Sequence, residues 1–342
     1  MTKEELYYGM LSLLATEYDE NTTDYVEHVR SLFEKYREII NRLDAKDRPL
    51  NYARSLQDAN NSIETLLQAI NFYYAGLYIQ AYESIKDHLD QCKHIYCYLG
   101  GIFFRMRVVE NRVALPQEEI FHIPFDKRAF IATERYSSPG LPCLYLGSTC
   151  YTCWKELSEP ELQDTYVSAF KGEQNNKYLN MTAPVLKTWN DNNEKTANAV
   201  FNHDIAIFPY IISSMVKVAN RNASFKPEYI VPQLVMHWVI ERFYSGIDSK
   251  KDQLIGVAYT SVFFDPSSEH GVLLNRNIAI PAYVGSNKYY SDLLRDRYSF
   301  SNPVCMLSLK NKLAVSNPYT SYFILDKELS DDTLFPRYKL MC

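Results

Sequence analysis

The first part of the chain carries apolar residues at helical intervals. Residues 6–14 have this spacing, and they follow Thr2 and Glu5, which stand three positions apart as in a capping box. A longer apolar stripe covers residues 26–40, so we expect a second helix that begins near Thr23 or Asp24. Both patterns predict amphipathic helices that bury one face.

A third helical segment is expected from residue 62 to residue 89, after a break at Pro49 and with Gly76 between its two halves. Its sequence AINFYYAGLYIQAYESI resembles one helix–turn–helix unit of a tetratricopeptide repeat. Only one copy is visible, and a repeat architecture needs about three. We therefore expect a helical bundle or packing module over residues 1–98.

The pattern changes after residue 96, where short apolar runs alternate with Pro, Gly, Asn and Asp. Several runs are rich in β-branched and aromatic residues, which favours strands. Two helices are expected among them, over about residues 149–158 and 230–243. The fold class is therefore α+β, with a mixed α/β domain over residues 99–342. The predicted strands are IFFRMRVV, AFIATERY, CLYLG, YVSAFK, DIAIFPYII, LIGVAYTSVFF and NIAIPAYV.

Charge and composition exclude several classes of protein. The net charge is −5 and no block of Lys and Arg stands out, so nothing indicates a nucleic-acid surface. Apolar runs stay short of the roughly 18 residues of a membrane span, and the acidic start MTKEELYYGM is not that of a signal peptide. Seven cysteines do not form a disulfide framework, so we expect a cytoplasmic protein.

Two groups of cysteines are candidates for a metal site. Cys150 and Cys153 form a CxxC motif seven residues after Cys143, and a second group comprises residues 92, 94 and 97. A structural zinc ion needs four well-placed ligands, and neither group offers them. We expect no metal. Dinucleotide-binding and phosphate-loop glycine motifs are also absent from the sequence, so a dinucleotide would be a substrate and not a cofactor.

Arg135, Tyr145 and Glu156 are the residues with the most suggestive chemistry. An arginine offers a planar fork of donors for phosphate oxygens. A tyrosine ring can stack on nicotinamide, and a glutamate can stabilise the cationic transition state that forms when a glycosidic bond stretches. Together they are suited to breaking the nicotinamide–ribose bond of NAD, whose nicotinamide is already a cationic leaving group.

Local structure suggests how these side chains could meet. Arg135 is expected near the end of one strand and Tyr145 in the next, with the turn SSPGLP between them as in a hairpin. Ser148 or Thr149 is a natural N-cap for the following helix, and Glu156 would lie about two turns into it. The three side chains would then face one cleft.

The segments ERYSSPGLPCLYLGS, TCWKEL and LIGVAYTSVFF, with EEIFHIPFDKR upstream, resemble the RES-domain family over roughly residues 100–285. The resemblance implies an ADP-ribosyltransferase-like fold and NAD degradation, and several family members are toxins of bacterial toxin–antitoxin pairs. It implies Arg135, Tyr145, Glu156 and Ser261 as the catalytic set. Arg105 and Tyr136 are further candidates for substrate binding beside Arg135, Tyr145 and Ser261.

Three functions stay open at this point. The first is an NAD glycohydrolase or phosphorylase that passes ADP-ribose to water or phosphate. The second is an ADP-ribosyltransferase that modifies a protein or nucleic acid. The third is an inactive binding module that works through its helical N-terminus. For an active enzyme we expect a restraint on NAD loss, either an inhibitory protein partner or self-inhibition by residues 1–95.

Overall fold

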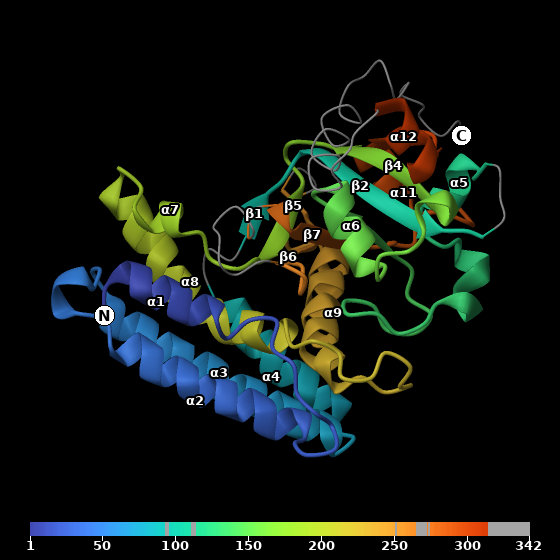
Figure 1. Ribbon diagram of the computed structural model, residues 1–342. Helices are drawn as coiled ribbons and strands as arrows, with labels where there is room; N and C mark the ends of the chain where they lie inside the picture. The colour runs from blue at the N-terminus through green and yellow to red at the C-terminus, as the bar shows by residue number, and fades with distance from the viewer. Residues whose placement is uncertain (93–95, 111–113, 250–251, 265–271, 273, 314–342) are drawn as a thin grey trace.

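A layer of helices packs beside one mixed sheet in the computed structural model (Figure 1), which describes residues 1–342 except 93–95, 111–113, 250–251, 265–271, 273 and 314–342. The fold is α+β, as predicted. None of the described helices is both long enough and apolar enough to cross a membrane. The helices are α1 (Lys3–Leu11), α2 (Tyr25–Asn41), α3 (Tyr52–Tyr74), α4 (Tyr78–Gln91), α5 (Gln117–Ile120), α6 (Cys150–Glu156), α7 (Leu186–Trp189), α8 (Glu194–Ser214), α9 (Ile230–Ser245), α11 (Asp292–Arg297) and α12 (Met306–Leu313), with short 3-10 turns at η1 (Ala45–Asp47), η2 (Phe125–Phe130), η3 (Leu162–Asp164) and η4 (Pro227–Tyr229).

The sheet has the strand order β1-β5-β6-β7-β3-β2-β4-β8, with β9 paired to β4. The pair β5 and β6 is parallel, and the other described pairs are antiparallel. Strand β3 therefore lies inside the sheet, with both of its edges occupied. The strands are β1 (Tyr96–Tyr98), β2 (Gly101–Val108), β3 (Cys143–Gly147), β4 (Thr165–Gly172), β5 (Lys177–Met181), β6 (Leu254–Thr260), β7 (Arg276–Pro281), β8 (Tyr298–Phe300) and β9 (Val304–Cys305).

The N-terminal helices begin where their capping residues predict. Thr2 caps α1, and its capping box with Glu5 is complete. Asp24 caps α2 by accepting a hydrogen bond from the Glu27 N–H. The third expected helix begins earlier than predicted, at Tyr52, and the turn between α3 and α4 places Gly76 at a φ of +76°. Glycine adopts this left-handed conformation without strain.

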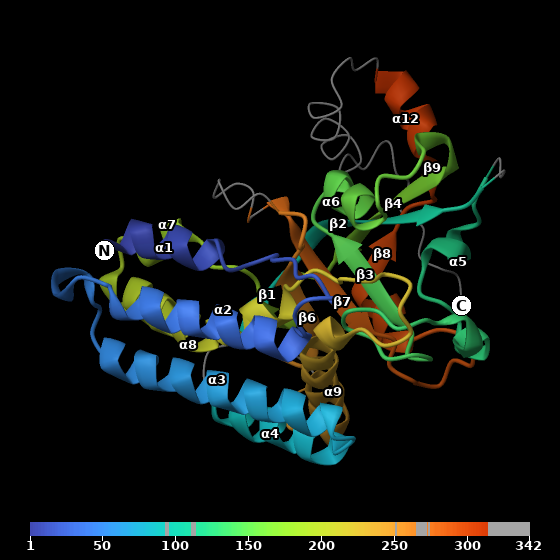
Figure 2. The same ribbon diagram turned by 60° about the horizontal axis from the view of Figure 1, so that its bottom comes forward.

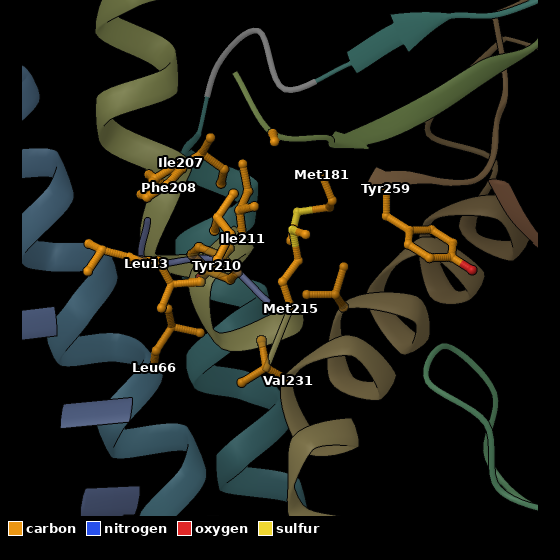
Figure 3. Packing of buried hydrophobic residues seen from close by; sticks show 14 of the residues in the cluster. Leu13, Leu66, Met181, Ile207, Phe208, Tyr210, Ile211, Met215, Val231 and Tyr259 are labelled. Carbon is orange, nitrogen blue, oxygen red and sulfur yellow. The ribbon is translucent and has the colours of Figure 1, made fainter. Parts of the chain in front are cut away.

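The helical layer is continuous with the rest of the core. In Figures 1 and 2, α1, α2, α3 and α8 run side by side, and α9 stands between this layer and the sheet. One cluster of buried apolar residues extends from α1 to β6. Figure 3 shows part of this cluster, from Leu66 on α3 through Tyr210 and Met215 to Met181 and Tyr259 at the sheet. The hydrophobic core is thus not divided at residue 98, the domain boundary suggested by sequence.

One predicted strand is wrong, because DIAIFPYII lies inside helix α8. Asn193 caps this helix, and helices α2, α3, α7 and α9 all contact it. It is buried on nearly every side from Ile205 onward, so its apolar residues form no stripe at helical spacing. A short run that is apolar all round cannot be told from a buried strand by periodicity alone.

The run AFIATERY is not a strand either, so the expected hairpin does not exist. After η2 the chain has no regular structure up to an isolated bridge between Glu134 and Ser137. This segment cannot pair with β3 as predicted, because β2 and β7 already occupy the two edges of that strand. Phe130 is 80% exposed, so this segment buries too little to join the sheet. It forms a wall of a cavity instead.

Candidate functional site

Strand β3 presents Tyr145 to the helical side of the sheet. Leu144 and Leu146 point to the opposite face, where they join a second apolar cluster, because side chains alternate along a strand. The Tyr145 hydroxyl accepts a hydrogen bond from the Tyr136 N–H at 3.1 Å and lies 3.0 Å from the Ser137 Oγ. Burial raises the pKa of this phenol well above its usual value, so it stays neutral. Tyr145 therefore holds the loop that carries Arg135.

Helix α6 brings Glu156 to the same side. Thr149, one of the two caps that the sequence predicted, accepts a hydrogen bond from the Thr152 N–H at 3.0 Å. Glu156 is its last residue, and its Oε1 accepts a 2.8 Å hydrogen bond from the side-chain amide of Asn277 on β7. The Ser261 hydroxyl also forms a hydrogen bond with Glu156. Residues at the end of β6 and at the start of β7 thus orient the Glu156 carboxylate.

The electrostatic state of Glu156 is set by opposing effects. The surrounding protein raises the pKa of its carboxyl, because it partly desolvates the charged form. Hydrogen bonds from Ser261 and Asn277 and the positive charges of Arg135 and Arg221 oppose this shift, and the net pKa is still raised. Glu156 is nevertheless an exposed residue, and it lines the cavity.

Gly147 lets these elements approach closely. A Cβ placed on it would lie 2.7 Å from the Cys153 Sγ and 3.2 Å from the Asn277 Oδ1. Any side chain there would therefore push apart helix α6 and the amide that holds Glu156.

Arg135 lies in the irregular loop before β3. Its Nη1 donates to the carbonyls of Ser214, the last residue of α8, and Val216, at 2.5 and 3.1 Å. Its guanidinium also lies over the Tyr229 ring, 5.3 Å from the centroid. These contacts fix the position of the charge and use part of its hydrogen-bonding capacity.

Arg105 extends from β2 toward the same space. Its Nη1 donates to the Tyr145 carbonyl at 3.1 Å, while its Nε is buried and has no hydrogen-bond partner among the described residues. Burial lowers the pKa of this guanidinium to about 10, so it remains charged at neutral pH. An unpaired N–H on a buried cation favours an anionic ligand.

A cavity of about 890 Å³ brings these residues together. This volume is within the range of about 300–1,000 Å³ of small-molecule sites. Arg105, Arg135, Tyr145 and Glu156, which sequence analysis singled out, all line it. Further lining residues include Glu17, Tyr18, Phe130, Glu134, Lys217, Arg221, Lys226, Tyr229, Tyr259, Phe263 and Asn277.

Two sequence candidates do not line the cavity. Tyr136 is buried in the main core, where its ring packs 4.7 Å from that of Tyr259. Ser261 is also fully buried, and its backbone N–H donates to the Asn275 carbonyl. The structure therefore puts Ser261 behind Glu156 and Tyr136 behind Tyr259, each one layer away from the cavity.

None of the described cysteines forms a disulfide bond. In the described parts of the chain, no three His, Cys, Asp or Glu side chains gather closely enough to hold a metal ion. His94, which belongs to the second group considered above, lies outside the described residues.

Comparison with known proteins gives one informative match. The chain is 32% identical over 230 residues to "Putative toxin YopC" of Bacillus subtilis (strain 168). The match covers 63% of this chain, but the chain spans only half the length of that relative. Neither family models nor solved structures match this chain.

Sequence reasoning missed several residues of the site. Asn277 gave a weak signal, because it is a polar residue that opens the apolar run NIAIPAYV. Glu17, Lys217 and Arg221 gave none, since Glu17 stands far from the other two in the sequence. Only the packing of the helical layer against the sheet brings them to one cavity.

Proposed function

We propose that this protein is a toxin-type enzyme that consumes NAD. It breaks the bond between nicotinamide and ribose and transfers the ADP-ribosyl group to water or phosphate. The observation that carries the proposal is the single cavity that Arg135, Tyr145 and Glu156 line together. The resemblance of these residues to the RES-domain family and the toxin name of the Bacillus subtilis relative point in the same direction. The proposal includes an ADP-ribosyltransferase-like arrangement of the domain.

The proposed reaction needs little proton transfer at its start. The C1′–N1 bond breaks, the electron pair leaves with the cationic nicotinamide, and neutral nicotinamide departs. The ribose carbon becomes cationic, and the Glu156 carboxylate would stabilise that charge. Water then adds through its oxygen to C1′ and releases a proton to solvent.

The other residues divide the remaining tasks. Tyr145 would offer its ring to the nicotinamide and ribose end, since its hydroxyl already holds the loop at Tyr136. Arg135 and Arg105 would face the diphosphate, because both residues line the cavity. Ser261 and Asn277 would act through Glu156, by keeping its carboxylate oriented and ionised.

The direct test is incubation of the purified protein with NAD and chromatography of the products, with and without phosphate. Free nicotinamide with ADP-ribose, or with its phosphate ester, would support the proposal. With NAD labelled on the adenosine side and added cell extract, label on a macromolecule would indicate a transferase instead. Intact NAD under all conditions would contradict both enzymatic functions and favour a binding module.

The pH dependence follows from the raised pKa of Glu156. The carboxylate is the active form, so NAD cleavage should fall as pH decreases through this pKa, with a midpoint above the ordinary value of 4.5. Asn277→Ala removes a hydrogen bond that lowers this pKa, so the midpoint should move to higher pH. A profile of kcat/KM against pH for both proteins measures the shift.

Asn41→Ala is the matched control, because it removes an exposed amide from α2. Its profile should overlay that of the wild type. Equal midpoints for Asn277→Ala and the wild type would show that the acid limb belongs to another group.

A further inference from the structure

Residues 16–18 of the helical layer lie along residues 217–219, which follow helix α8. The Lys217 N–H donates to the Thr16 carbonyl at 2.9 Å. The Glu228 Oε1 joins the two segments again, because it accepts from the Tyr18 hydroxyl at 2.8 Å and from the Ala219 N–H at 2.9 Å. The N-terminal helices therefore contribute a wall of the cavity through Glu17 and Tyr18.

Lys217 lies next to the part of the chain that Arg135 holds. Arg135 Nη1 donates to the Val216 carbonyl, and Lys217 is the next residue. Because Nη1 already donates to backbone carbonyls, Arg135 has fewer N–H groups left for a diphosphate, which carries two negative charges. Lys217 lines the same cavity and can supply a second cation beside it.

In the structure, Lys217 forms an ion pair with Glu17. Its Nζ lies 2.8 Å from the Glu17 Oε1, and the two side chains are 34% and 75% exposed. Ion pairs this exposed are weak, because water screens both charges. A doubly charged ligand inside the cavity can therefore replace Glu17 at the ammonium.

We propose that Lys217 binds the diphosphate of the substrate and that Glu17 competes with the substrate for it. This assignment rests on the proposed function, because the diphosphate is that of NAD. It makes the helical layer a determinant of substrate affinity, since the competing carboxylate comes from the connection between α1 and α2.

The two partners should change affinity in opposite directions. Glu17→Gln frees Lys217, so KM for NAD should fall about 1.5- to 5-fold, the scale of an exposed ion pair. Lys217→Gln removes the ammonium that binds the diphosphate, so it should raise KM for NAD by about 10-fold or more. The double variant should resemble Lys217→Gln, because Glu17 then has nothing to compete for. If the pair only ties the helical layer to the sheet, both single variants would weaken binding alike.

ADP-ribose is the second probe, because its binding by calorimetry does not depend on catalysis. Its affinity should follow the same order, with Glu17→Gln tightest and Lys217→Gln weakest. Glu34→Gln and Lys35→Gln, on the exposed side of α2, are matched controls that should match the wild type. If the wild-type protein cleaves NAD but both variants change KM for NAD in the same direction, this inference alone is overturned. A wild-type protein that neither cleaves NAD nor binds ADP-ribose would overturn the proposed function itself.

Discussion

Glu156→Gln is expected to fold like the wild type and to lose NAD cleavage, with kcat lower by about 10²- to 10³-fold. The substitution keeps the size of the side chain and one oxygen that can accept from Asn277. It removes the negative charge that would face the developing cation at the ribose carbon. Steady-state release of nicotinamide, measured with saturating NAD, gives the ratio directly.

Two further measurements separate lost chemistry from a lost cavity. Glu159→Gln is the matched control, because Glu159 is exposed, follows α6 and forms an ion pair with Lys155 outside the cavity lining. It should cleave NAD at the wild-type rate. Glu156→Gln should still bind ADP-ribose by calorimetry. If Glu156→Gln cleaves NAD at the wild-type rate, Glu156 has no part in the mechanism.

Elements that are fixed by neighbouring residues could be predicted from sequence. The caps of α1, α2 and α6 depend on side chains within three residues of the helix start, so Thr2 was identified, and Asp24 and Thr149 were each one of two candidates. The same holds for the α+β class, since most apolar runs after residue 96 are strands. Arg135, Tyr145 and Glu156 meet as expected, although not by way of a hairpin.

The errors arise where distant parts of the chain decide the local structure. Helix α8 has apolar residues on nearly all sides because four other helices cover it, and a sequence window contains no sign of them. The segment before β3 is rich in apolar and aromatic residues because it lines a cavity, not because it pairs in the sheet. Ser261 was expected to bind the substrate, but it is buried beside Glu156 and does not line the cavity.

Removal of residues 1–95 is expected to abolish both folding and NAD cleavage. Sequence alone suggested that activity would rise if this segment restrains the site. The structure changes the expectation, because the segment shares one apolar core with α8, α9 and β6 and supplies Glu17 and Tyr18 to the cavity. It also covers the backbone of α8, where the Tyr36 hydroxyl donates to the Ile205 carbonyl at 2.5 Å.

The free energies involved indicate that the deletion unfolds the protein and does not relieve an inhibition. Truncation of one buried leucine costs about 2–5 kcal/mol, and whole domains are stable by only about 5–15 kcal/mol. The deletion removes many such side chains at once, so the remaining chain should be insoluble or lack fixed tertiary structure. Soluble yield, gel filtration and near-ultraviolet circular dichroism measure this outcome.

Single substitutions give the same test on the full-length chain. Leu66→Ala, at a fully buried position of α3, should lower the free energy of unfolding by about 2–5 kcal/mol. Leu50→Ala, at a position that is 76% exposed, should change it by less than about 0.5 kcal/mol. If the helical layer were instead a detachable inhibitor, the truncated protein would stay monomeric and would cleave NAD faster than the full chain. Loss of activity together with loss of fold is expected instead, because the layer that would restrain the site is also part of its wall.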